Sequence, residues 1–267
     1  MGPVFLGADY DQDKVMPDLS KIKTYLILAS PRTGSTLLCS MLYSTARYGV
    51  PYEYFNQPIN MAGRLGVTKT PKRINSIDMT AYIKALLENR TTGHNMVWGA
   101  KVFPPHVSWM LQSELGLKIL QRSPVIRLTR KNKLDQAISH VIAAQTGTWN
   151  TTSRSQGKEP VFKFGKILQT MHKLQMQDNF WDLLCAKYKL NPLEISYDDL
   201  SHHTQATGEK VMKHLTGEPT QFKFSTSPDA VVVDKLDTTH NSAFREKFLN
   251  RLKFERAGQA TKILSDF

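Results

Sequence analysis

The sequence is poor in cysteine and contains no long apolar run. Its two cysteines, Cys39 and Cys185, are too few and too far apart for a disulfide framework in a chain of 267 residues. No apolar stretch approaches the ~18 residues of a membrane-spanning helix. The N-terminus lacks the basic and apolar segments of a secretory signal, and Leu6 does not fit a myristoylation pattern. We therefore expect no membrane span and a location in the reducing cytoplasm.

Acidic residues are scarce relative to basic ones. The chain has 35 Lys and Arg but 23 Asp and Glu, which gives a formal net charge of +12. Such a charge favours anionic partners: nucleic acid, acidic lipid or a multiply phosphorylated small molecule. The basic residues are spread along the chain and form no dense short run. A nucleic-acid binder is thus an alternative hypothesis. Because the basic residues are dispersed, however, we expect no nucleic-acid partner.

Short apolar runs alternate with helical patterns along most of the chain. Four runs are predicted as strands: 25–29, 96–102, 125–129 and 193–196. This alternation predicts an α/β fold with a central parallel β-sheet flanked by helices. We expect a loosely ordered lead-in over residues 1–20 and a single domain over residues 21–267.

Several helices are marked by apolar residues at helical spacing. One begins after Asp78, which can cap it, and ends near Gly93. Others are predicted over 132–145, 162–190 and 244–256. The polar segment 147–160 is long enough to form a mobile lid or a disordered insert.

The stretch ASPRTGST connects the first predicted strand to a helix. Backbone N–H groups at the start of such a helix favour an anion, and the helix dipole adds to this. Gly34 allows close approach of the backbone, and Ser35 and Thr36 can donate hydroxyl hydrogen bonds and cap the helix. Arg32 supplies a positive charge beside Thr33. We expect all five residues to bind a phosphate-like group.

The loop differs from the ATP-binding pattern GxxxxGK[ST]. Ala29 stands at the first glycine of that pattern and Ser35 at its lysine. A nucleoside triphosphate enzyme also needs an acidic metal ligand at a strand end, whereas the run VIRLTR ends in Arg130. The sequence therefore favours an anion that binds without metal, with a P-loop-like nucleotide kinase as the alternative.

A second basic turn follows the third predicted strand. Arg130 lies at the carboxyl end of this strand, where parallel α/β sheets bind ligands, and Ser139 lies on the following helix. Together they could hold a second phosphate.

With both loops in view, the chain resembles a known enzyme family. LASPRTGSTLL is similar to the 5′-phosphosulfate loop of sulfotransferases that use 3′-phosphoadenosine 5′-phosphosulfate (PAPS), and RKNKLDQAIS to their 3′-phosphate motif. The resemblance is to the bacterial trehalose 2-sulfotransferase (Stf0-like) type. PYEYF, WGAKVF and ISYDDL also match, so it extends from about Thr24 to Leu200.

This resemblance implies a P-loop-like sulfotransferase fold and the transfer of a sulfuryl group from PAPS. The acceptor would be a hydroxyl of a carbohydrate, glycolipid or small metabolite, and no metal would be required. Arg32 and the loop N–H groups would stabilise charge on the leaving group, and Lys101 would assist them. The oligomeric state stays open, with a homodimer as one alternative.

The resemblance also implies a general base. The related carbohydrate enzymes place a glutamate where Glu53 stands in PYEYF, and His106 is the second candidate. Because Glu53 is flanked by Tyr52, Tyr54 and Phe55, we expect burial to raise its pKa and the rings to stack on a sugar face.

Overall fold

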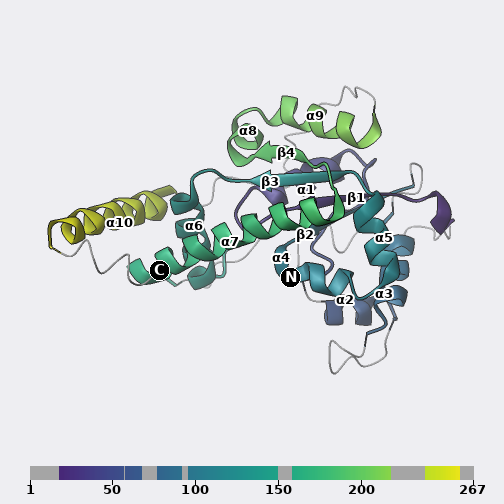
Figure 1. The fold of residues 1–267 in the computed structure, drawn as a ribbon, viewed down its shortest axis with the longest axis horizontal. Coiled ribbons are helices and arrows are strands. Elements are labelled where there is room, and N and C mark those ends of the chain that lie inside the picture. Colours follow the sequence, from purple (N-terminus) through teal and green to yellow (C-terminus); the bar gives the residue numbers. More distant parts are fainter. Residues whose placement is uncertain are drawn as a thin grey trace. The chain divides into compact units, whose positions relative to one another are not determined.

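The structure is a computed structural model that describes residues 18–56, 58–67, 77–91, 96–149, 158–217 and 238–258. The described elements follow one another along the chain, and four strands alternate with helices (Figure 1). In chain order they are η2 (Leu19–Lys21), β1 (Lys23–Leu28), α1 (Ser35–Ser44), α2 (Pro58–Arg64), α3 (Met79–Arg90), β2 (Val97–Val102), α4 (Pro104–Met110), α5 (Glu114–Arg122), β3 (Val125–Thr129), α6 (Lys133–Thr146), α7 (Phe164–Tyr188), β4 (Leu193–Ser196), α8 (Tyr197–His202), α9 (Thr204–Thr216) and α10 (Thr238–Gly258).

The described residues form two compact units. The first combines residues 18–131 with 176–217, and the second combines 132–175 with 238–258. Helix α7 contributes residues to both. The single domain expected over residues 21–267 stays a prediction, and most of the expected lead-in, residues 1–17, lies outside the described residues.

The first unit is built on a four-stranded sheet in which every pairing is parallel. The strand order is β2-β1-β3-β4, and the register aligns Ile27 with Lys101 and Leu28 with Arg127. All four predicted strands are confirmed, with bounds that differ by at most two residues. Because the strands are parallel, their carboxyl ends lie at one edge of the sheet, and the segments that follow them start there.

Both faces of the sheet are covered by helices. Successive residues of β1 point to opposite faces, so Leu26 belongs to one apolar cluster and Ile27 to the other. The first cluster packs β1 and β2 against α3, α4, α5 and the end of α7, and the second packs β1, β3 and β4 against α1 and α9. Burial of both faces explains why the strands read as apolar runs without alternation.

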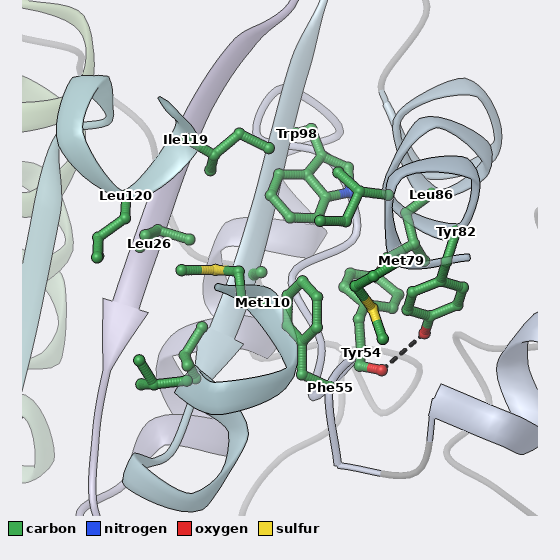
Figure 2. Close-up of a cluster of buried hydrophobic side chains, with 14 of the residues drawn as sticks. Leu26, Tyr54, Phe55, Met79, Tyr82, Leu86, Trp98, Met110, Ile119 and Leu120 are labelled. Atoms are coloured by element: carbon green, nitrogen blue, oxygen red, sulfur yellow. Dashed lines mark hydrogen bonds between the residues drawn. The ribbon is translucent and has the colours of Figure 1, made fainter. Parts of the chain in front are cut away.

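Figure 2 shows how the first cluster holds the segment that precedes α2. The rings of Tyr54 and Phe55 lie among the buried side chains, and Tyr54 stacks on Trp98 of β2 with ring centroids 5.9 Å apart. The Tyr82 hydroxyl of α3 donates to the Tyr54 carbonyl oxygen at 2.7 Å. These contacts fix the backbone directly after Glu53.

The second unit packs α6 against α10 and the first part of α7. Its core includes Ile138 of α6, Ile167 of α7 and Phe244 of α10. The helices predicted over 132–145, 162–190 and 244–256 are confirmed, although α10 begins earlier, at Thr238. Residues 150–157 of the predicted lid or insert lie outside the described part of the chain. Within that described part, the helices are too short or too polar to cross a bilayer.

Asp78 caps α3 as predicted, because its carboxylate accepts hydrogen bonds from the backbone N–H groups of Thr80 and Ala81. The predicted exit at Gly93 lies outside the described residues. Asp78→Ala should lower the free energy of unfolding by about 0.5–2 kcal/mol in urea denaturation, since it removes the carboxylate oxygen that accepts both bonds. Asp78→Asn keeps a capping oxygen and should stay close to wild type. Equal losses in both variants would contradict a capping role.

Candidate active site

The loop after β1 turns sharply before α1 begins. The turn uses two left-handed residues, Arg32 with a φ of 68° and Gly34 with a φ of 79°. A Cβ atom at position 34 would lie 3.1 Å from side-chain atoms of both Tyr197 and Leu200. Backbone conformation and close packing therefore both favour glycine at this position.

The start of α1 corrects one prediction. Ser35 and Thr36 were expected to cap this helix, but they are its first two residues, and the N-cap is Gly34. Glycine has no side chain that could bond to the first-turn N–H groups, which point toward the loop. The Thr33 hydroxyl donates to the Ser30 carbonyl oxygen at 2.8 Å, so an anion would meet the backbone of Thr33 and not its side chain.

The start of the loop is held by α7. The Trp181 indole N–H donates to the carbonyl oxygen of Ala29 at 3.0 Å, and the Ser30 hydroxyl donates to the Asp178 carboxylate at 3.2 Å. Arg127 of β3 in turn donates to the Asp178 carbonyl oxygen at 3.1 Å. The loop therefore begins from a backbone that is fixed from two sides.

Arg32 and Arg130 lie close together at the carboxyl edge of the sheet. The Arg130 guanidinium donates to the Arg32 carbonyl oxygen at 3.2 Å and stacks on the Tyr197 ring, 4.3 Å from its centroid. Burial, together with the like charge of Arg130, lowers the pKa of Arg32 to about 10. Both side chains still carry positive charge at neutral pH, so an anion placed here would relieve their repulsion.

Sequence reasoning did not assign a role to Tyr197. Its ring contacts Arg130 and limits the space at Gly34, so it shapes both basic turns. A signal was present: Tyr197 directly follows the predicted strand 193–196, and therefore lies at the same sheet edge as the other two turns.

Lys101 and Glu53 form an ion pair beside the loop. The segment before α2 pairs with β2 through a parallel bridge between Tyr52 and Ala100, and the Lys101 N–H donates to the Tyr52 carbonyl oxygen at 3.0 Å. Lys101 Nζ consequently lies 2.7 Å from Glu53 Oε1 and donates to Thr36 Oγ1 at 3.3 Å. The Lys101 side chain is 4% exposed and that of Glu53 is 21% exposed.

The pKa of Glu53 corrects another prediction. Burial acts to raise it, as expected, but the Lys101 ammonium and hydrogen bonds from Lys101 and Asn56 outweigh burial, and the pKa is lowered. For Lys101, burial acts to lower the pKa, and the Glu53 carboxylate outweighs it, so the pKa is raised. Both groups are therefore charged at neutral pH.

The aromatic neighbours of Glu53 also differ from expectation. Tyr54 and Phe55 are buried in the first apolar cluster, as Figure 2 shows, so neither ring can stack on a sugar. The prediction was wrong because burial of large aromatic rings is strongly favourable, and these two rings pack under α3. The sequence pattern alone does not indicate this packing. Tyr52 is half-buried, and sugar stacking stays a prediction for this residue.

His106 lies near the ion pair, in the first turn of α4. Its Nδ1 accepts a hydrogen bond from the backbone N–H of Phe103 at 3.4 Å, and the side chain is buried. Burial lowers the pKa of His106, and the charge of Lys101 adds to this while Glu53 opposes it. The ring is thus neutral at neutral pH, with its proton on Nε2 and its lone pair on Nδ1 turned to the backbone.

Ser139 lies on α6 in the second unit, whereas Arg130 belongs to the first. A joint phosphate site for these two residues stays a prediction. Arg245 Nη1 of α10 donates to both carboxylate oxygens of Asp135 of α6, at 2.7 and 2.9 Å, so the negative charge of Asp135 is compensated within the second unit.

Among the residues that the structure describes, no cluster of three His, Cys, Asp or Glu side chains could ligate a metal ion. The site instead combines a helix N-terminus with two arginines, a lysine and a carboxylate. Such a site suits a dense, multiply charged anion next to a group that can exchange a proton.

Comparison with known proteins identifies the family. The family model for Stf0 sulphotransferase matches residues 24–248. The chain belongs to this family. It is therefore a sulfotransferase, and the resemblance seen in its motifs is confirmed.

Two curated relatives are each named trehalose 2-sulfotransferase. The protein from Mycobacterium tuberculosis is 26% identical over 229 residues, which cover 74% of this chain and 86% of the relative. The protein from Mycolicibacterium smegmatis is 23% identical over 226 residues, covering 73% and 85%. Among solved structures, the sulfotransferase domain from the curacin biosynthetic pathway has a TM-score of 0.44 and 19% identity, over 83% of this chain and 82% of that chain.

The ion pair makes stability depend on pH. The lowered pKa of Glu53 stabilises the folded protein above the ordinary carboxyl pKa, and this stabilisation is lost as pH falls through the lowered pKa. In Lys101→Met the strongest influence that lowers the pKa of Glu53 is lost, so burial, which raises this pKa, gains weight. This variant should lose about 3–5 kcal/mol of unfolding free energy at neutral pH and progressively less as pH falls and Glu53 becomes protonated.

The double variant Lys101→Met, Glu53→Gln has no buried charge at this position, so it should recover most of the loss. Urea denaturation of the three proteins between pH 4 and pH 8 measures these effects. A loss in Lys101→Met that is independent of pH and is not recovered would show that the charge of Glu53 is not its cause.

Proposed function

We propose that this enzyme transfers a sulfuryl group from PAPS to a hydroxyl of a carbohydrate. The observation that carries the proposal is the Lys101–Glu53 pair, which lies within hydrogen-bond distance of the α1 N-terminal turn. A helix N-terminus, a cation and a carboxylate thus lie together at one sheet edge, which supports the proposal.

The loop residues would hold the 5′-phosphosulfate of the donor. The N–H groups of Gly34, Ser35 and Thr36 and the guanidinium of Arg32 would bind its oxygens, as expected from the sequence. Charge would build up on the 5′-phosphate as it leaves, and these donors would stabilise it. Arg130, oriented by its stacking on Tyr197, would bind the 3′-phosphate, and the contribution of Ser139 stays a prediction from the sequence.

Of the two candidates for the general base, Glu53 is favoured. The basic nitrogen of neutral His106 is Nδ1, and this atom accepts the Phe103 N–H. Proton uptake there would break a bond at the start of α4, whereas Glu53 Oε1 exchanges one cationic partner for a proton. We assign His106 to holding the backbone after β2 and proton transfer to Glu53.

The reaction then balances as a single displacement. Glu53 accepts the proton of the acceptor hydroxyl while the hydroxyl oxygen forms a bond to sulfur. The bond from sulfur to the bridging oxygen breaks, and its electron pair goes to the 5′-phosphate that Arg32 and Lys101 stabilise. Alignment of the attacking oxygen, sulfur and leaving oxygen is the main geometric demand.

The names of the two curated relatives point to the acceptor class. Both are called trehalose 2-sulfotransferase, and they cover about three quarters of this chain. We therefore propose a carbohydrate hydroxyl as acceptor, with trehalose as the first compound to test. Membership of the Stf0 family removes the kinase alternative considered from the sequence.

Donor binding can be tested by thermal unfolding with adenosine 3′,5′-bisphosphate, the product nucleotide. At 100 times its Kd it should add about 2.7 kcal/mol of stability and raise the Tm clearly. Arg32→Ala and Arg130→Ala should lose most of this rise, because each removes a phosphate-binding guanidinium. Arg122→Ala, at the exposed end of α5, is the matched control and should keep it. A Tm rise with ATP and Mg²⁺ but none with the bisphosphate would overturn the proposed donor.

The base assignment can be tested by turnover of PAPS with trehalose and a panel of other sugars. Glu53→Gln should lower kcat by about 10²–10⁴-fold while bisphosphate binding is retained. His106→Asn keeps an acceptor near the position of Nδ1 and should change kcat by less than about tenfold. The reverse pattern, with a large loss in His106→Asn and a small one in Glu53→Gln, would make His106 the base.

A further inference from the structure

Lys101 contacts two parts of the site at once. Its Nζ is 2.7 Å from Glu53 Oε1 on one side and donates to Thr36 Oγ1 at 3.3 Å on the other. Thr36 belongs to the first turn of α1, where the phosphosulfate is proposed to bind. The backbone of Lys101 is fixed in β2 by its pairing with Ile27 and its bond to Tyr52, so only the flexible side chain can move.

We propose that donor binding draws the Lys101 ammonium from Glu53 to the phosphosulfate, and that this exchange activates Glu53 as the general base. The inference rests on the proposed function and adds an order to it: the carboxylate becomes basic only when the donor is present. A lysine ammonium is a point charge with three donors on a flexible stem, which allows a change of partner over a short distance.

The groups around Glu53 explain why the position of Lys101 determines the proton affinity of this carboxylate. The groups that face the carboxylate are Lys101 from β2, His106 from α4, the Cys39 thiol from α1 and the Asn56 amide, which donates at 2.9 Å. Tyr52, its neighbour in the chain, is a phenol. At neutral pH, Lys101 is the cation in this set, because His106 and the thiol are neutral.

Removal of the lysine would reverse the balance at Glu53. Burial raises its pKa and is the largest single influence on it, while the attraction of Lys101 is the next largest and lowers it. When Lys101 turns to the donor, burial prevails and the carboxylate gains affinity for a proton. When the product nucleotide leaves, Lys101 returns and Glu53 releases its proton to solvent, which resets the site.

This coupling predicts that at mildly acidic pH nucleotide binding takes up a proton at Glu53. At neutral pH the carboxylate stays ionised but more basic, and it takes its proton from the acceptor hydroxyl. Isothermal titration calorimetry with adenosine 3′,5′-bisphosphate, in buffers of different ionisation enthalpy between pH 5 and pH 6.5, measures the uptake. Glu53→Gln provides the reference, because the phosphates of the ligand titrate equally in both proteins. Wild type should take up more protons than Glu53→Gln, by up to about one per nucleotide bound.

Two further variants separate the exchange from a general effect of binding. Lys101→Met has no cation to exchange, so nucleotide binding moves no positive charge away from Glu53 and the extra uptake should disappear. Asn56→Ala removes the other hydrogen-bond donor to Glu53 and should keep the extra uptake. Where Lys101→Met fails to fold, wild type with carbon-13 in its glutamate carboxyl groups should show one carboxylate becoming protonated in an infrared difference spectrum on binding.

The outcomes distinguish the inference from the function on which it rests. Equal proton uptake in wild type and Glu53→Gln, with tight bisphosphate binding and normal turnover in wild type, would overturn the exchange and leave the sulfotransferase function intact. Absence of bisphosphate binding to wild type would overturn the proposed donor and the exchange with it.

Discussion

Parallel pairing of the four strands is the constraint on which the site depends. It brings the carboxyl ends of β1, β2 and β3 to one edge, where the loop 29–34 follows β1, Lys101 lies near the end of β2 and Arg130 follows β3. Lys101 and Thr36 are 65 positions apart in sequence, yet the register of β2 beside β1 places them in contact. An antiparallel β2 would carry Lys101 to the opposite edge, far from the loop.

The Lys101–Glu53 pair is better explained by chemistry than by stability. Moving both charges out of water is unfavourable, and pairs of this kind are often no more stabilising than apolar side chains of similar size. A leucine and a methionine would fill the same space without the cost of moving charges out of water. Under the proposed function, the pair instead supplies one proton acceptor and one cation beside a helix N-terminus, where both would act on the same ligand.

Much of the fold could be predicted from the sequence, because the strands are buried on both faces and read as apolar runs. The Asp78 cap and the amphipathic helices were found for a similar reason, since each has a local pattern. The ion pair could not be found in this way. It depends on the bridge between Tyr52 and Ala100 and on burial of Tyr54 under α3, which are tertiary contacts without a local signature.

The sign of the pKa change at Glu53 shows the same limit. Aromatic neighbours predicted burial correctly, but the direction of the change depends on a cation that approaches from another strand. Likewise, the chain pattern at the loop suggested hydroxyl capping, whereas the fold uses a left-handed glycine packed on Tyr197. Position along the chain identified the candidate residues, and only their packing defined their electrostatic state.

Helix α7 has a consequence for how the molecule can be divided. Its 25 residues begin in one compact unit and end in the other, so the boundary between the units falls inside a continuous helix. Cutting there would leave up to four carbonyl and four amide groups without their helical partners on either side of the break. The two units are therefore not modules that evolution or engineering could exchange at a linker. Fusion or circular permutation of this enzyme would therefore have to leave α7 unbroken.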